Sequence, residues 1–370
     1  MDQLLPATVT TRLDPERRWR TLSTALDVSR TQPYAPCQER RFADVRLRSA
    51  WVRSFAASGP ERERLVQAVE VSRSSSRAAA GMRRMLQWYA GCEQARMQLL
   101  DAYAIRRDGP DDVVLVLRRW SRPVRTVTVG LSRSGVVTTA VVHTVDRPRG
   151  PGLARFGDLM NEVVSRVCTT SGGRCDTRGD VRPSTLPRTG EGAGFLGVVD
   201  LPPVARLTTT WAGTEPVRAA PNPTATLCDE ADFVGAGATP ARSRVYVMPE
   251  AKALPKEFGI SETVGRFAKP SEAAGFLHRV AARIEGCPDR NVTADVAKVV
   301  QTRHGARTSV AWRISYEVSD TRSLHYWLAF VRDGNRLAQI AFSTARGFDI
   351  SPSQLHALME RAGQRLREIG

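Results

Sequence analysis

Two segments of the chain, RAAAGMRRMLQWYAGC at residues 77–92 and EAAGFLHRVAARIEGC at residues 272–287, share one pattern, and each ends at a cysteine. In both, apolar residues are spaced i, i+3, i+4 and i+7, which places four side chains on one face of an α-helix. These residues are Met82, Met85, Leu86 and Tyr89 in the first segment and Leu277, Val280, Ala281 and Ile284 in the second. The pattern predicts two similar helices, each with one buried face, and Ser76 and Ser271 are their expected N-caps.

The sequence before and after these helices also repeats. Trp19 stands 18 residues before Cys37, and Trp211 stands 17 residues before Cys228. Matching positions are 191 residues apart at these two cysteines, 195 at the cysteines that end the helices, and 199 near the end of each half. A repeat of this length predicts two similar structural units.

The composition changes between the two halves. Residues 176–197 are rich in Gly, Pro, Ser and Thr and lack periodicity, which is typical of a linker. We therefore place one domain at residues 1–175 and a second at residues 198–370. Two domains also suit a chain of 370 residues, because domains usually have about 100–200 residues.

Three β-rich runs follow each of the two helices. They are residues 113–120, 125–131 and 136–145 in the first half and residues 309–318, 324–332 and 336–345 in the second. Gly135 and Gly334 stand between the last two runs of each half, where a hairpin turn is expected. A closing helix is predicted at 152–167 and at 351–368. This order predicts an α+β fold in each domain, with a twisted, mostly antiparallel sheet flanked by helices.

The six cysteines have spacings that suit disulfides. One pair is 55 residues apart, its counterpart in the second half is 59 apart, and a third pair closes a short loop. Because equivalent cysteines should pair equivalently, the predicted bonds are Cys37–Cys92, Cys228–Cys287 and Cys168–Cys175. Disulfides indicate an oxidising, extracytoplasmic compartment. The alternative is a cytoplasmic chain with reduced thiols.

The chain is strongly basic, with a formal net charge of +16. Of its 54 basic residues four are lysines, and the arginines are dispersed rather than gathered in runs. This distribution favours general affinity for polyanions over sequence-specific binding of nucleic acid. A basic polyanion-binding or cell-wall-binding protein is therefore an alternative function.

The sequence contains no stretch that predicts a membrane span. Its longest strictly aliphatic run is VVLVL at residues 113–117, far below the roughly 20 residues that a transmembrane helix needs. The first 20 residues are charged and do not look like a signal peptide. We expect either the mature form of an exported protein or the outer part of a larger membrane protein.

A search for catalytic motifs predicts no enzyme, cofactor or metal site. The five histidines do not have the spacing of a helical zinc site, and no phosphate-binding loop, Rossmann fingerprint or nucleophile elbow occurs. One enzyme class stays open as an alternative. Small-molecule enzymes of the NTF2 type use an acid and a tyrosine in a sheet-lined pocket, and Tyr316 and Glu317 lie together on a predicted strand.

Both halves resemble the PknH-like extracellular sensor domain of actinobacteria. The matching features are a Leu-Pro start with a Trp, a cysteine before a variable β segment, the strand–helix–Cys element, the hairpin and the closing helix. The resemblance implies intradomain disulfides and a cleft for a ligand of unknown identity, and it brings no catalytic residues. This chain departs from that family's receptor kinases in having no kinase domain.

The expected function is thus a non-enzymatic extracytoplasmic sensor or ligand-binding protein. Its expected partner is an unknown small molecule or cell-envelope ligand. Aromatic and arginine side chains over the sheet are the candidate contacts, because these residue types are enriched at binding surfaces. They are Trp88, Arg119, Trp120, Tyr326 and Trp327.

Overall fold

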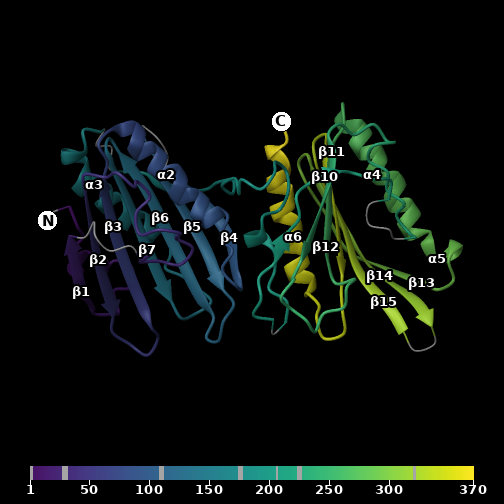
Figure 1. Ribbon diagram of the computed structural model, residues 1–370, viewed down its shortest axis with the longest axis horizontal. Helices are drawn as coiled ribbons and strands as arrows, with labels where there is room; N and C mark the ends of the chain where they lie inside the picture. The colour runs from purple at the N-terminus through teal and green to yellow at the C-terminus, as the bar shows by residue number, and fades with distance from the viewer. Residues whose placement is uncertain are drawn as a thin grey trace. The chain divides into compact units, whose positions relative to one another are not determined.

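The chain folds into two compact units, Met1–Pro187 and Arg188–Gly370. The computed structural model describes residues 3–26, 32–107, 112–173, 178–205, 207–222, 227–319 and 322–370. Each unit contains one eight-stranded antiparallel sheet with helices packed against it (Figure 1). The predicted α+β class is therefore confirmed.

Unit 1 contains the first eight strands. They are β1 (Trp19–Leu26), β2 (Ser49–Ala57), β3 (Glu63–Val71), β4 (Met97–Arg106), β5 (Asp112–Arg119), β6 (Arg125–Ser134), β7 (Val137–Val145) and β8 (Asp180–Pro183). Its helices are α1 (Ala7–Thr10), α2 (Ser75–Ala90) and α3 (Leu153–Ser171). The strands lie in the order β1-β2-β3-β7-β6-β5-β4-β8.

Unit 2 contains the other eight strands. They are β9 (Ala212–Gly213), β10 (Val217–Arg218), β11 (Ala241–Val247), β12 (Gly259–Arg266), β13 (Ala294–His304), β14 (Arg307–Ser319), β15 (Arg322–Asp333) and β16 (Arg336–Ser343). Its helices are η1 (Val198–Asp200), α4 (Pro270–Glu285), α5 (Cys287–Arg290), α6 (Pro352–Arg365) and η2 (Leu366–Glu368).

The two sheets have corresponding strands in the same order. In unit 2 the order is β10-β11-β12-β16-β15-β14-β13, so β11, β12, β16, β15, β14 and β13 take the places of β2, β3, β7, β6, β5 and β4. Gly135 and Gly334 occupy the same turn, between β6 and β7 and between β15 and β16, and both have positive φ values, 53° and 63°. Glycine adopts this left-handed conformation without the steric cost that a Cβ brings.

Each sheet packs against other elements on both of its faces, and successive side chains of a strand point alternately to the two faces. In unit 1, Val141 of β7 packs with α3, while the hydroxyl of Thr138 donates to Ala78 O of α2 on the other face at 3.3 Å. In unit 2, Ile340 of β16 belongs to the core beneath α6, and Ala341 to the core beneath α4. Each sheet is thus the middle layer of three.

The helix starts differ from the predicted N-caps. Ser74, not Ser76, caps α2 and accepts a hydrogen bond from Arg77 N at 3.3 Å. In unit 2 Lys269, not Ser271, is the N-cap residue of α4, because Pro270 begins the helix. Proline suits the first helical position, where its fixed φ is helical and no N–H is needed.

The segment predicted as a linker is more structured than its composition indicates. Residues 180–183 form β8, and Val181 packs against the α3 core at Gly157, where a Cβ would lie 2.4 Å from the valine. Further along, Phe195 and Leu196 are buried in the core of unit 2. The division between the units falls after Pro187. A short strand such as β8 is stabilised by tertiary contacts of one apolar residue, Val181, and composition does not reveal such contacts.

Candidate functional site

A cavity of about 410 Å³ opens on the α2 face of the unit 1 sheet. Its floor consists of side chains from three neighbouring strands: Val52 of β2, Val66 of β3, and Val142 and Thr144 of β7. Thr144 and Val142 share a face with Thr138, which contacts α2, because alternate residues of a strand point the same way. The cavity therefore has a mainly apolar base formed by paired strands.

A loop covers the part of this face that α2 leaves open. Tyr34 and Phe42 of the loop pack against Val52 and Ala68, and Tyr34 lines the cavity. The disulfide between Cys37 and Cys92 ties the loop to the end of α2, with the two Cα atoms 5.1 Å apart. The wall of the cavity is thus attached covalently to the helix.

A buried carboxylate holds the other end of the loop. Glu70 of β3 accepts hydrogen bonds from Ala43 N and Asp44 N at 3.0 Å each. Burial raises the pKa of Glu70 to about 7, against the opposing effect of these backbone hydrogen bonds. Arg77 of α2 adds an ion pair to Asp44 at 3.1 Å. These contacts fix the loop from the strand and from the helix.

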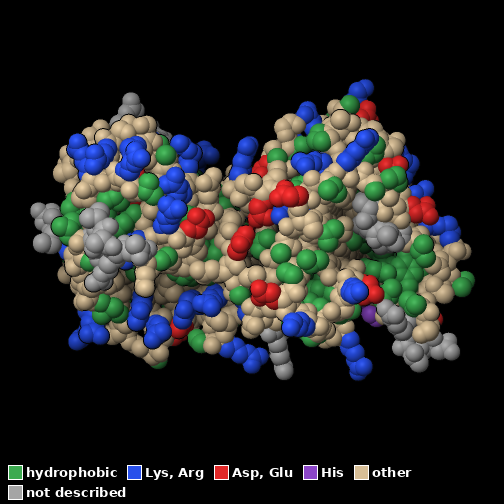
Figure 2. Space-filling model, viewed as in Figure 1, with side chains coloured by type: hydrophobic (Ala, Val, Ile, Leu, Met, Phe, Trp, Pro, Cys, Tyr) green, Lys and Arg blue, Asp and Glu red, His purple; other side chains and the backbone are tan. Residues whose placement is uncertain are grey.

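Four arginines line the rim of the cavity: Arg41, Arg62, Arg64 and Arg125. Arg125 is paired with Asp146 at 2.6 Å. Arg62 and Arg64 are exposed and form no ion pair with any residue that the structure describes. Figure 2 shows Lys and Arg side chains at both the upper and the lower end of this unit, and the lower end carries the β2–β3 and β5–β6 connections in Figure 1.

This arrangement can bind a ligand with an anionic group and an apolar part. Guanidinium groups form charge-assisted, often bidentate hydrogen bonds to carboxylate, sulfonate or phosphate oxygens. The valine floor would remove an adjoining apolar group from water. Among the described residues, no cluster of three or more His, Cys, Asp or Glu side chains has the arrangement of a metal site. We call this cavity, with its four arginines, the arginine cleft.

A second cavity, of about 380 Å³, lies in unit 2 between α4 and strands β13, β14 and β15. Leu277 and Val310 supply apolar surface, and Lys298, Arg303 and Arg332 supply positive charge. Arg332 is buried and donates to Gly334 O at 3.0 Å and to Thr308 Oγ1 at 3.2 Å. This cavity is not the counterpart of the arginine cleft, because it lies on the opposite side of its helix, towards the sheet edge.

The three candidate contacts in unit 1 do not form one site. Trp88 is buried under α2 at 2% exposure. Trp120 donates from Nε1 to Gln98 Oε1 at 3.0 Å beyond the end of β5. Arg119 is the nearest to the arginine cleft, because it lies opposite Arg125 in the β5–β6 pair.

The two candidates in unit 2 point to opposite faces of β15. Trp327 is buried against α6, where its Nε1 donates to Asp349 at 2.7 Å and the Arg313 guanidinium lies 4.5 Å from its ring centre. Tyr326 packs on the α4 face against Tyr316, with ring centres 5.6 Å apart. Neighbouring strand residues cannot share one site, because the side chains alternate.

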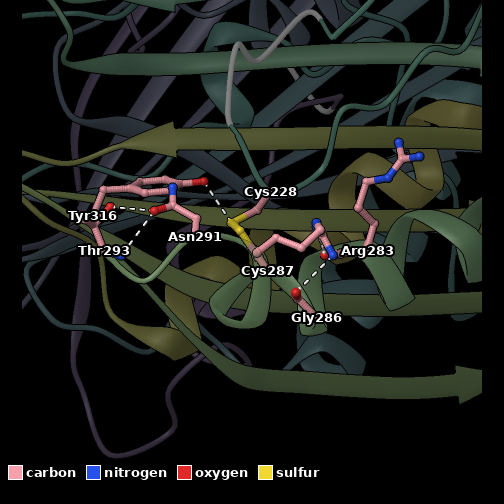
Figure 3. Close-up of a disulfide and its surroundings, with 8 residues drawn as sticks. Cys228, Arg283, Gly286, Cys287, Asn291, Thr293 and Tyr316 are labelled. Carbon is pink, nitrogen blue, oxygen red and sulfur yellow. Dashed lines mark hydrogen bonds between the residues drawn. A yellow bond between two sulfur atoms is a disulfide. The ribbon is translucent and has the colours of Figure 1, made fainter.

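The acid–tyrosine pair of the alternative enzyme class is also separated. Tyr316 is buried, and its hydroxyl donates to Cys228 Sγ at 2.8 Å, beside the disulfide with Cys287 (Figure 3). Glu317 follows it on the strand, is exposed, and points to the other face. The Cα atoms of Cys228 and Cys287 are 5.2 Å apart. The third predicted bond, Cys168–Cys175, involves Cys175, which lies outside the described residues.

Sequence reasoning did not select the arginines of the cleft, because they are far apart in the chain and look like surface charges. A comparison of the two halves would have shown them. At the matching offsets, Glu257, Gly259 and Leu324 replace Arg62, Arg64 and Arg125. The positive charge at this place is therefore a property of unit 1 alone.

No protein-family model matches the chain, and no curated protein matches it. Three solved structures are similar to parts of it at low TM-scores. The extracellular domain of PknH from Mycobacterium tuberculosis has a TM-score of 0.31 and 11% identity, over 43% of this chain and 86% of that chain. The acyl-CoA thioesterase TesB2 from Mycobacterium marinum has a TM-score of 0.14 and 12% identity, over 75% and 91%. The MucA/MucB complex of Pseudomonas aeruginosa has a TM-score of 0.15 and 10% identity, over 95% and 96%.

Among the described residues, no helix combines the length and the apolar character that crossing a membrane requires.

Proposed function

We propose that this chain is a non-enzymatic extracytoplasmic sensor or ligand-binding protein of two PknH-like domains, with its ligand site in the arginine cleft of unit 1. The observation that carries the proposal is the pair Arg62 and Arg64. Both guanidinium groups stand at the rim of an apolar-floored cavity without an acidic partner among the described residues. The ligand class is a small molecule or cell-envelope component that joins an anionic group to an apolar body.

The chemistry of the cleft supports binding rather than catalysis. Arginine stays protonated at every physiological pH, so it holds an anion well but does not exchange protons with a substrate. The remaining lining side chains are aliphatic, aromatic or hydroxyl-bearing. The two disulfides in the part of the chain that the structure describes support the extracytoplasmic location, because such bonds persist in oxidising compartments.

The alternative is a polyanion-binding or cell-wall-binding protein, and the net charge of +16 favours it. A polyanion would contact arginines over a wide surface, and its affinity would depend on their number more than on their place. The two functions therefore differ in how strongly they depend on Arg62 and Arg64.

The test uses the full chain and the fluorescent sulfonate 8-anilinonaphthalene-1-sulfonate, an anion with an apolar aromatic body. The double variant Arg62→Ala/Arg64→Ala is compared with Arg73→Ala/Arg83→Ala, which removes two exposed arginines of the same unit that do not line the cleft. Charge-assisted hydrogen bonds contribute about 1.5–3 kcal/mol each, so we expect binding to weaken roughly tenfold or more in the first variant and to stay near the parent value in the second.

Two further titrations define the outcome. Uncharged N-phenyl-1-naphthylamine should bind both double variants equally, because it lacks the anionic group. Equal weakening of sulfonate binding in the two variants would refute the cleft. If heparin affinity also fell equally in both, the polyanion function would replace the one proposed.

A further inference from the structure

The two sheets end differently at corresponding edges. In unit 1, β8 covers the edge strand β4 as an antiparallel strand, with Ala104 opposite Arg182 and Arg106 opposite Asp180. In unit 2, β13 pairs with β14 on one side, and no described residue pairs with it on the other. An edge strand of this kind presents unpaired N–H and C=O groups that can accept another strand.

The uncovered stretch of β13 corresponds to the covered stretch of β4. Gln301 lies opposite Val310 in β14, as Ala104 lies opposite Val113 in β5. Two positions further along, Arg303 takes the place of Arg106. Ala104 is 6% exposed, whereas Gln301 and Arg303 are exposed. The same part of the sheet is therefore closed in one unit and open in the other.

The backbone of this stretch is suitable for pairing. A bulge interrupts the β13–β14 register between Lys298 and Val300, and from Val300 onward the register is regular. The two-residue turn at 305–306 closes on the pair His304 and Arg307. Because hydrogen-bonded and non-hydrogen-bonded pairs alternate from such a turn, the peptide groups of Gln301 and Arg303 face away from β14.

The side chains beside this edge are basic. Gln301 and Arg303 line the 380 Å³ cavity of unit 2 together with Lys298 and Arg332. Glu285 is the acidic residue of this described lining, and Lys298 already pairs with it at 2.6 Å. In unit 1 the residue opposite the equivalent arginine is an acid, Asp180. A strand that pairs here would gain from a carboxylate opposite Arg303.

We propose that residues 300–303 of β13 bind an extended acidic peptide segment, which adds to the unit 2 sheet as an antiparallel strand. The peptide exchanges main-chain hydrogen bonds with Gln301 and Arg303, and it places a carboxylate opposite Arg303. Its alternate side chains then lie over the cavity beneath α4. This is β-strand addition, in which the backbone supplies affinity and the side-chain positions supply specificity.

The probe is an acetylated and amidated peptide, GDVEPST, which is residues 179–185 of this chain with Arg182→Glu. Binding is followed on the full chain by amide chemical shifts in an NMR titration. We expect the shifts to map to β13, and we expect hydrogen exchange of the Gln301 and Arg303 amides to slow. Replacing the peptide aspartate by asparagine, or Arg303→Ala in the protein, should weaken binding by about fivefold, as for a half-exposed ion pair.

Two changes remove single backbone donors. Gln301→Pro deletes the outward N–H and should abolish the shifts on β13, whereas Gln301→Ala keeps it and should bind like the parent. Proline is tolerated at such an edge position when its missing N–H faces solvent. Methylating the peptide nitrogen of its glutamate blocks the same pairing without touching the protein and should also abolish binding.

The results that would overturn the inference are specific. They are an absence of shifts on β13, equal binding of the methylated peptide, or shifts confined to the arginine cleft of unit 1. The sulfonate titration of the cleft is independent of these outcomes, because Gln301 and Arg303 do not line that cavity. Failure of either proposal therefore leaves the other open to its own test.

Discussion

The same place in the two sheets is filled by opposite chemistry. In unit 1, Glu63 Oε1 lies 2.6 Å from His143 Nε2, and both side chains are sealed from solvent. In unit 2 the equivalent residues are Phe258 and Phe342, whose rings meet edge to face with centres 5.4 Å apart. A tryptophan packs beside each pair: Trp19 against His143 in unit 1, and Trp211 against Phe258 in unit 2.

This comparison shows that the fold requires a buried pair of suitable size at this position, not a particular charge. A buried pair of a carboxylate and a polar partner gains attraction but loses hydration, so its net contribution to stability is small. Arg17 lies 3.2 Å from the second oxygen of Glu63. Burial raises the pKa of Glu63, but His143, Arg17 and Arg147 together bring it below its usual value, so the carboxylate is ionised in the core.

The largest expected effect comes from breaking this pair on one side. His143→Phe leaves the Glu63 carboxylate buried without its imidazole partner, and we expect unit 1 to lose about 3–5 kcal/mol of unfolding free energy. Glu63→Phe/His143→Phe installs the pair of unit 2 and should restore most of that loss. Urea unfolding of the parent, both single variants and the double variant gives the coupling free energy. A double variant that loses the sum of the single losses would contradict the equivalence of the two pairs.

A somewhat smaller effect is expected from the disulfides, one of which lies in each unit. Removing a bond that closes a loop of this length should cost about 4 kcal/mol, or less if the native geometry is strained. Cys37→Ala/Cys92→Ala should destabilise unit 1 and also weaken sulfonate binding, because this bond attaches the loop that lines the arginine cleft. Cys228→Ala/Cys287→Ala should destabilise unit 2 and leave sulfonate binding unchanged. Calorimetry and the fluorescence titration together separate the two results, and equal binding losses would argue against the loop as part of the site.

The smallest effect concerns a buried acid that differs between the units. Glu262 Oε2 accepts a hydrogen bond from Leu196 N at 3.0 Å, and Gln67 Oε1 accepts the equivalent bond from Leu5 N at 2.7 Å. Burial raises the pKa of Glu262 to about 8, from 4.5. The folded state therefore holds the Glu262 proton more tightly than the unfolded state does. The contribution of protonated Glu262 to the unfolding free energy is complete below pH 4.5 and is lost as the pH rises to about 8.

Glu262→Gln introduces the residue type of its unit 1 equivalent, Gln67, and should remove the loss of unfolding free energy at high pH. We expect the variant to gain roughly 1–3 kcal/mol over the parent above pH 8 and nothing at pH 4.5. Thermal unfolding across that pH range measures it, and the difference from the parent cancels the effect of Glu70, whose pKa is also raised. A constant difference at all pH values would show that Glu262 is ionised in the fold.

The same hydrogen bonds correct the alignment of the two halves at their start. The Leu-Pro start that the two halves share stands at residues 5–6 and at residues 201–202. The bonds to Gln67 and Glu262 show instead that Leu5 corresponds to Leu196, so α1 corresponds to η1. Short motifs of two residues carry too little information to set a register, whereas a buried backbone N–H must find a defined acceptor.

Several strands escaped prediction, and β4 and β13 are the clearest examples. β4 and β13 follow the first long helix of each unit and form one side of each sheet, yet neither has a regular alternation of apolar residues. A bulge interrupts both of them, after Leu99 and after Lys298, which shifts the alternation by one residue. Periodicity alone therefore missed both strands, and with them the contrast between β4, which β8 covers, and the open edge strand β13.

The sequence by itself determined the α+β class, the buried faces of α2 and α4 and the cysteine pairs that lie at disulfide distance, because these depend on periodicity and on spacing along the chain. Only the tertiary structure decided where function can reside. Arg62, Arg64 and Arg125 come together across β3 and β6, and Arg303 stands at an edge that β8 covers in the other unit. A binding site depends on which side chains from distant strands meet and which backbone groups stay unpaired, and neither is encoded in any local pattern.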